Sequence, residues 1–179
     1  SIFIEKELGY NKFQQRQSEN EILSEKQIEN FRALISELKT GKPYQQILGE
    51  TEFYGLKFFV DEHILIPRPE TEELLELAIE KIKARSLKSE VIKILDIGTG
   101  SGIIPIVLKK HFPQAEISAI DFSEKALKTA KRNADFHEVE INFIHQNYLN
   151  ADLTEIYDVI ISNPPYIGME EEVEIADSV

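Results

Sequence analysis

The sequence predicts an α/β protein whose larger part is a doubly wound, mainly parallel β-sheet. Three observations support this: continuous apolar runs alternate with helical patterns from Val91 onward, a glycine-rich turn follows the first run, and polar residues follow the later ones. Continuous apolar strands separated by helices indicate a parallel sheet covered on both faces. We expect a helical domain over residues 1–42, a β-hairpin linker over 43–68 and the sheet domain over 69–179.

The composition restricts the classes of protein and of site. A chain of 179 residues suits one full domain and a smaller one, and 42% hydrophobic residues exclude a wholly disordered chain. The absence of cysteine excludes disulfides and thiolate metal sites. The four histidines are scattered and form no ligand-like cluster, so we expect no metal.

The net charge of -12 argues against a broad nucleic-acid-binding surface, which gains affinity by neutralising phosphates with Lys and Arg. No apolar run approaches the ~18 residues of a membrane span, and the first residues contain no signal-peptide core. We therefore expect a cytoplasmic monomer with no membrane or direct nucleic-acid partner. The chain begins without methionine and reaches only a fourth strand, so we expect further strands of the sheet outside it.

The N-terminal region is polar and helical. Ser24 and Gln27 have the spacing of a capping box, and Gly41 and Pro43 are typical of the residues after a helix end. Between them an apolar stripe recurs at intervals of three and four, formed by Ile28, Phe31, Ile35 and Leu38.

The linker contains short aromatic and glycine-punctuated segments. We expect a hairpin that pairs Leu56–Val60 with Ile64–Ile66. Pro67-Arg68-Pro69 prevents continuation of the strand, and a helix begins near Pro69–Thr71, where proline is tolerated. Its buried face is predicted to consist of Leu74, Leu75, Ala78, Ile79 and Ile82.

Four strands are expected in the sheet domain, and helices connect the first three. The strands are Val91–Leu95, Ala115–Ile120, Ile141–His145 and Tyr157–Ser162. The first helix covers about 102–111 and has Pro105 in its first turn, where a missing amide hydrogen is harmless. Ser123 is a candidate cap for the second helix.

A glycine-rich turn, Asp96 to Gly102, joins the first strand to the first helix. Glycines allow a tight reversal and let a ligand approach the backbone. A dinucleotide-binding fingerprint requires a small residue at position 103, where Ile103 stands, so the pattern is instead similar to the first motif of class I methyltransferases. The alternative is a turn that serves only close packing. Asp121 ends the second strand at the position of a ribose-binding acid.

Asn163-Pro164-Pro165-Tyr166 follows the fourth strand, so it faces the same edge of the sheet as the glycine turn. Two prolines remove two amide donors, which leaves the Asn163 side-chain oxygen and the Pro164 carbonyl as acceptors beside a flat aromatic ring. This arrangement suits an NH2 group on a planar system, as in a carboxamide or a nucleobase. Acceptors that bind both hydrogens would hold the nitrogen in line for methyl transfer.

These motifs together resemble one family. Asn163–Tyr166 is shared by several amino-methyltransferases, including adenine-specific DNA enzymes and guanine-specific RNA enzymes. In combination with Gln46–Gly49, Glu52–Gly55 and Ile66–Glu72, it resembles the HemK-type release factor glutamine methyltransferases. The resemblance extends from about Gly41 to Ile167.

The resemblance implies a Rossmann-like methyltransferase that transfers a methyl group from S-adenosylmethionine to the glutamine N5 of the Gly-Gly-Gln motif of a peptide chain release factor. Asn163 and Pro164 would be the catalytic residues, and Asn163 through Tyr166 would bind the glutamine amide. The cofactor would be bound by Asp96, Gly98, Thr99, Gly100, Ser101, Gly102, Asp121, Asn147, Tyr148 and Asn163. The Pro67–Glu72 segment would close over it, and the N-terminal helices would contact the release factor.

Asn147 departs from the family, which has aspartate there to accept from the adenine amino group; a neutral acceptor is weaker. Two other functions stay open. One is methylation of adenine or guanine amino groups in nucleic acid with the same acceptors. The other is a cofactor-binding module that does not catalyse.

Overall fold

The computed structural model describes residues 2–85, 91–150 and 154–164. The chain forms two compact units, Ser1–Thr51 and Glu52–Val179, which we describe separately.

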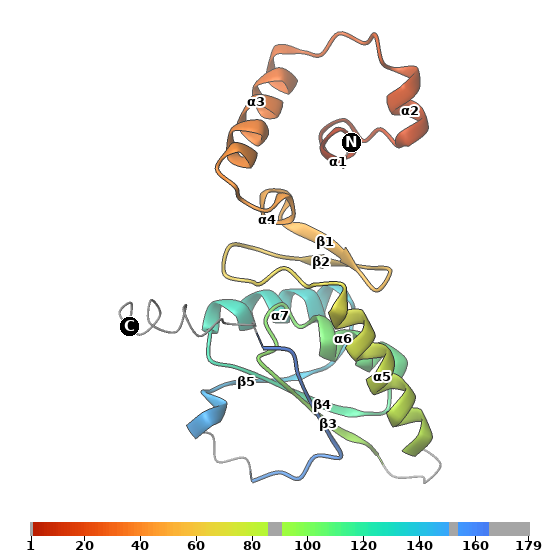
Figure 1. Ribbon diagram of the computed structural model, residues 1–179, viewed down its shortest axis with the longest axis vertical. Coiled ribbons are helices and arrows are strands. Elements are labelled where there is room, and N and C mark those ends of the chain that lie inside the picture. Colours follow the sequence, from red (N-terminus) through yellow and green to blue (C-terminus); the bar gives the residue numbers. More distant parts are fainter. Residues whose placement is uncertain (1, 86–90, 151–153, 165–179) are drawn as a thin grey trace. The chain divides into compact units, whose positions relative to one another are not determined.

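The first unit is built from short helices, as expected for the N-terminal region (Figure 1). They are α1 (Ile2–Leu8), α2 (Lys12–Gln17), α3 (Glu25–Lys39) and α4 (Tyr44–Leu48). The predicted capping box is confirmed: Gln27 donates its backbone amide to Ser24 Oγ at 3.3 Å, and Ser24 donates its own to Gln27 Oε1 at 2.8 Å. These reciprocal bonds satisfy two amide groups that the helix leaves without a partner.

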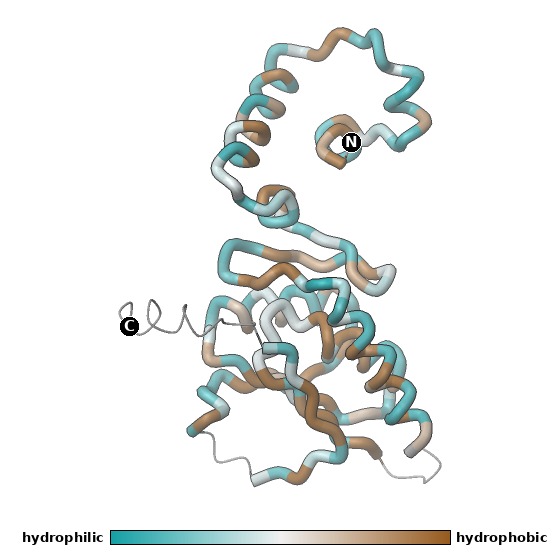
Figure 2. Tube along the Cα trace, viewed as in Figure 1, coloured by the Kyte–Doolittle hydropathy of each residue, from teal (hydrophilic) through white to brown (hydrophobic). Residues whose placement is uncertain are grey.

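The apolar stripe of α3 has the predicted helical spacing but is poorly buried. Ile28, Ile35 and Leu38 remain 37%, 49% and 37% exposed, and α3 contains no buried residue. Apolar segments recur along this helix among hydrophilic ones (Figure 2). The N-terminal unit therefore has little hydrophobic core of its own.

The hairpin is formed by β1 (Glu50–Phe53) and β2 (Leu56–Phe59), so the predicted pairing of Leu56–Val60 with Ile64–Ile66 is wrong. Tyr54 and Gly55 join the strands with φ values of 52° and 69°, the positive values of a two-residue hairpin turn. Ile64 does not extend a strand because the chain turns after Asp61, whose carbonyl accepts the Ile64 amide at 3.3 Å; the Ile64 side chain is buried with Val60 and Ala126.

The second unit contains the expected parallel α/β sheet (Figure 1). Its strands are β3 (Lys93–Ile97), β4 (Glu116–Asp121), β5 (Asn142–His145) and β6 (Val159–Ser162), in the spatial order β5-β4-β3-β6. The helices of this unit are α5 (Glu70–Arg85), α6 (Ile103–His111), α7 (Glu124–Phe136) and the 3-10 turn η1 (Tyr148–Asn150). The strand order reverses between β3 and β6, which is the arrangement of a doubly wound sheet.

One face of this sheet packs on the helices. Ile94 of β3 is in register with Ile117 of β4, and Ile161 of β6 lies two residues beyond the partner of Ile94 on that strand. The three side chains belong to one buried cluster with residues of α5 and α6. Leu75 and Ile82 of α5 are fully buried there, as predicted for its apolar face. Because side chains alternate along a strand, Asp96 shares this helix-covered face with Ile94.

The predicted helix starts are also confirmed. Pro105 lies in the first turn of α6, and Ser123 caps α7 by accepting the Ala126 amide at 3.2 Å. Among the described helices, none combines the length and apolarity needed to cross a bilayer. The described residues also contain no cluster of three or more His, Cys, Asp or Glu suited to a metal ion.

Candidate functional site

The candidate site lies at the carboxyl ends of the four parallel strands. Ile97 is in register with Ile120 of β4 and with Ser162 of β6, so these three strands end at the same level. The glycine turn follows β3, and Asn163 follows β6. They therefore flank the point where the strand order reverses, which is where doubly wound sheets bind ligands.

The glycine turn has three positive φ angles, 73° at Gly98, 55° at Gly100 and 78° at Gly102. At Gly102 a Cβ atom would lie 3.1 Å from Cβ of Ala130, so this glycine is needed for the packing of α6 on α7. At Gly98 and Gly100 a Cβ would meet open space. The backbone there is accessible to a ligand, which close packing alone does not require.

Asp121, at the end of β4, holds the turn in place. Its Oδ2 accepts the Gly100 amide at 2.9 Å, and its Oδ1 accepts the Ser123 amide at 2.9 Å. Asp121 is only 8% exposed. Each carboxylate oxygen has further acceptor capacity, so Asp121 can organise the turn and still accept a ligand hydroxyl.

Asp96, the penultimate residue of β3, lies just before the glycines of the turn and is completely buried. Within the described residues neither of its carboxyl oxygens has a hydrogen-bond partner. Burial, reinforced by the negative charge of Asp121, raises the pKa of Asp96 to about 7. The Thr99 hydroxyl opposes this pKa shift, although it lies outside hydrogen-bonding geometry. A buried acid without a partner at a turn open to ligand suits a cationic or hydrogen-donating group.

Asn163 is tied to the start of α5. Its Nδ2 donates to Oγ1 of Thr71 at 2.7 Å, across 92 positions of sequence. Thr71 is 4% exposed, whereas Asn163 is half-buried and Pro164 exposed. Pro165 and Tyr166, which the sequence assigns to the same motif, lie outside the described residues.

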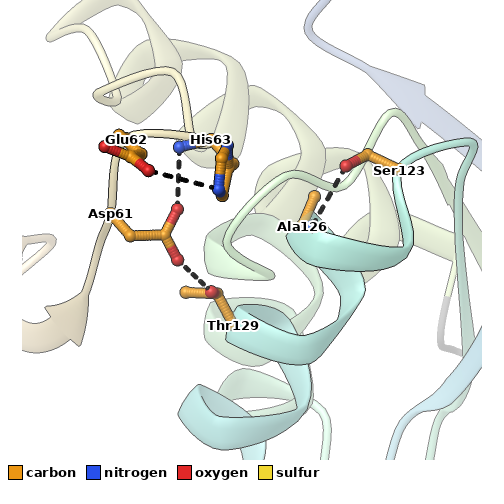
Figure 3. Close-up of polar contacts among 6 residues, drawn as sticks. All are labelled: Asp61, Glu62, His63, Ser123, Ala126 and Thr129. Carbon is orange, nitrogen blue, oxygen red and sulfur yellow. Dashed lines mark hydrogen bonds and ion pairs between the residues drawn. The ribbon is translucent and has the colours of Figure 1, made fainter.

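The segment before α5 is fastened to α7 and to the hairpin. Asp61 Oδ2 accepts from the Thr129 hydroxyl at 2.5 Å, and Asp61 Oδ1 accepts the His63 amide at 2.8 Å (Figure 3). At the other end Glu72 accepts the Tyr54 amide at 2.9 Å. The segment from Asp61 to the first turn of α5, which contains Thr71, is thereby fixed at both ends.

Asn147 and Tyr148 follow β5 at the same edge of the sheet. The Asn147 side-chain oxygen accepts the Leu149 amide at 3.0 Å, and Tyr148 is 50% exposed in η1. The described contacts do not link either residue to the glycine turn. The assignment of both residues to the cofactor stays a prediction.

Two buried polar residues of this region were not singled out in the sequence, although Thr71 lies in the Pro67–Glu72 segment expected near the cofactor. Thr71 stands beside Asn163, and Asn133 of α7 is fully buried. Asn133 Nδ2 donates to the carbonyls of Ser101 and Phe59, both at 2.9 Å, and its Oδ1 accepts the Phe59 amide at 2.7 Å. The detectable signal for Asn133 was an asparagine on the apolar face of a helix, next to Ala134.

Comparison with protein families identifies the region that contains the glycine turn, Asp121 and Asn163. Residues 76–178 match the family described as the methyltransferase small domain. The chain belongs to this family. Residues 1–49 match the PrmC N-terminal domain. The N-terminal helical unit and the sheet unit therefore each match a known family.

Curated relatives narrow the family and confirm the resemblance to HemK-type enzymes. The chain is 52% identical over 155 residues to the release factor glutamine methyltransferase of Flavobacterium psychrophilum, covering 86% of the chain and 54% of the relative. It is 43% identical over 179 residues to the release factor glutamine methyltransferase of Chlorobaculum tepidum, and this match covers 96% of the chain and 61% of the relative. The chain therefore spans little more than half the length of these relatives.

Solved structures confirm the methyltransferase fold. The human methyltransferase 10 domain containing protein matches with a TM-score of 0.52 and 23% identity, over 69% of this chain and 62% of that one. The tRNA (uracil-54, C5)-methyltransferase of Pyrococcus abyssi, solved with S-adenosyl-L-homocysteine, matches with a TM-score of 0.51 and 20% identity. The match covers 65% of this chain and 28% of that one. At these identities the similarity concerns the fold alone.

Proposed function

We propose that the protein containing this chain transfers a methyl group from S-adenosylmethionine to the side-chain amide nitrogen of the glutamine in the Gly-Gly-Gln motif of a peptide chain release factor. The observation that carries the proposal is the juxtaposition of an open glycine turn after β3 with Asn163-Pro164 after β6. The family match and the names of the curated relatives support the same chemistry.

The residues at the turn fit this cofactor. Gly98 and Gly100 leave their backbone accessible, and Asp121 retains acceptor capacity for a ribose hydroxyl. Asp96 offers a buried carboxyl that has no partner among the described residues, which suits the ammonium group of the cofactor. Bound S-adenosylmethionine would supply an electrophilic methyl group on a sulfonium.

An amide nitrogen is a poor nucleophile because its lone pair is delocalised into the carbonyl. In the proposed mechanism, Asn163 Oδ1 and the Pro164 carbonyl accept the two N–H groups of the substrate amide. These acceptors align the nitrogen and stabilise the positive charge that develops on it, at about 3 kcal/mol for each well-placed group. Held by these acceptors, the nitrogen would take the methyl group from the sulfonium, which would be left as a thioether, and one amide proton would leave to solvent.

The N-terminal helices, residues 1–42, would contact the release factor, and the enzyme would act as a monomer. The rival substrate is a nucleobase amino group, which the same two acceptors would bind. The net charge of -12 disfavours that rival because nucleic-acid binding is dominated by contacts to phosphate.

Transfer of a labelled methyl group to purified release factor, catalysed by the full-length protein, tests the proposal. A release factor with the Gly-Gly-Gln glutamine changed to asparagine serves as the matched control, and total RNA and DNA are assayed alongside. We expect label only in the unchanged release factor. Label in nucleic acid and none in the release factor would contradict the proposal, as would cofactor binding without any transfer.

A further inference from the structure

We infer that Thr71 is a positioning residue that sets which end of the Asn163 amide faces the substrate. The inference rests on the proposed function, in which Asn163 must present its oxygen. A carboxamide has an accepting oxygen and a donating NH2 group of nearly the same shape, and a half-turn about its last bond exchanges them. A donating NH2 group facing the substrate amide would repel its hydrogens and abolish the alignment.

In the structure the Asn163 amide has its nitrogen toward Thr71. Asn163 Nδ2 lies 2.7 Å from Thr71 Oγ1, a short hydrogen bond in which the hydroxyl accepts. With its nitrogen held on the side of α5, the amide directs Oδ1 away from Thr71. Because Thr71 is 4% exposed, water does not readily replace this acceptor.

The backbone around Thr71 makes the hydroxyl a fixed reference point. The Thr71 amide donates to the Arg68 carbonyl at 3.0 Å, and the Glu72 amide donates to the Pro69 carbonyl at 2.9 Å. The Glu72 carboxylate accepts the Tyr54 amide, so the first turn of α5 is tied to the hairpin. A side chain fixed by its own packing and hydrogen bonds positions a functional group better than a mobile one.

The test compares Thr71→Val, which keeps the shape and removes the acceptor, with Thr71→Ser, which keeps a hydroxyl. In full-length protein, Thr71→Val should lower kcat for methyl transfer by roughly ten- to a hundredfold. The Kd for S-adenosylmethionine should change by less than about threefold, because the variant leaves the glycine turn intact. Thr71→Ser should restore kcat to within about fivefold of the unchanged enzyme.

Ser118→Ala is a matched control. Ser118 is also a buried hydroxyl that accepts from an asparagine amide, with Asn142 Nδ2 at 3.2 Å, but it lies in the middle of β4. Its loss should leave kcat within about twofold while lowering the thermal midpoint. An equal loss of kcat in Ser118→Ala and Thr71→Val would overturn the inference, because the effect would then reflect general destabilisation.

A second measurement separates this inference from the proposed function. The two Nδ2 protons of Asn163, assigned in a 15N NMR spectrum by their absence in Asn163→Asp, should exchange with solvent at least about tenfold faster in Thr71→Val. If the unchanged enzyme methylates no release factor, the proposed function fails and the exchange data alone decide the role of Thr71. Unchanged exchange, or an unchanged kcat in an enzyme that is active, would overturn the inference.

Discussion

Replacement of Asp96 by asparagine should remove a pH-dependent loss of stability from the ligand-free protein. The Asp96 carboxyl is fully buried, has no hydrogen-bond partner among the described residues and lies near Asp121, all of which disfavour its ionised form. Its pKa rises from an ordinary value of 3.8 to about 7 in the folded protein. The folded state therefore binds this proton more tightly than the unfolded state.

The direction and size of the effect follow from proton linkage. Between pH 4 and 7 the carboxyl is protonated when folded and ionised when unfolded, so the free energy of unfolding falls as the pH rises. Above pH 7 both states are ionised and this contribution levels off. Because one pKa unit corresponds to about 1.4 kcal/mol, the total loss is about 4 kcal/mol, of which about 2–3 kcal/mol falls between pH 5 and 8.

Urea denaturation followed by circular dichroism at a series of pH values measures this contribution. The difference in free energy of unfolding, Asp96→Asn minus unchanged protein, should grow by about 2–3 kcal/mol from pH 5 to pH 8. Asp135→Asn, at an exposed carboxyl on α7, should give a profile parallel to that of the unchanged protein. A parallel profile for Asp96→Asn as well would refute the assignment of a buried, protonated acid.

Three further substitutions test the site. Asn163→Ala should lower methyl transfer by roughly a hundredfold or more while cofactor affinity, measured by calorimetry, stays within about tenfold; unchanged turnover would exclude it from amide binding. Asp121→Ala should weaken the affinity for the cofactor by at least about tenfold, because the substitution removes both an acceptor for the ligand and the partner of the Gly100 amide. An unchanged affinity would show that Asp121 does not belong to the cofactor site. Asn133→Leu leaves the Phe59 amide and two carbonyls without partners, so it should lower the free energy of unfolding by about 2–4 kcal/mol; a loss below about 1 kcal/mol in denaturation would show that these groups find other partners.

The sequence alone predicted the helix caps, the parallel sheet and the edge of the sheet at which the candidate site lies. The capping box at Ser24, the first-turn position of Pro105 and the cap at Ser123 depend on contacts within a few residues, so their patterns could be recognised directly. The parallel sheet followed from alternating strands and helices, and its carboxyl ends brought the glycine turn and Asn163 to one edge.

The predicted hairpin was wrong because Ile64 is buried by a helix that is distant in the sequence. Ile64–Ile66 is as apolar as a strand, yet Ile64 is buried against Val60 and Ala126 of distant α7. Periodicity reports that a side chain is buried but does not identify the element that covers it.

Only the tertiary structure decided how the polar groups of the site are arranged. The hydrogen bond from Asn163 to Thr71 spans 92 positions of sequence. Asn133 bonds to β2, 74 positions away, and to the glycine turn, 32 positions away. The burial that raises the pKa of Asp96 likewise depends on the helices packed over its face of the sheet. The sequence determines which groups are available and which strand end carries them. Their hydrogen-bond partners and protonation depend on distances between segments that meet only when the chain folds.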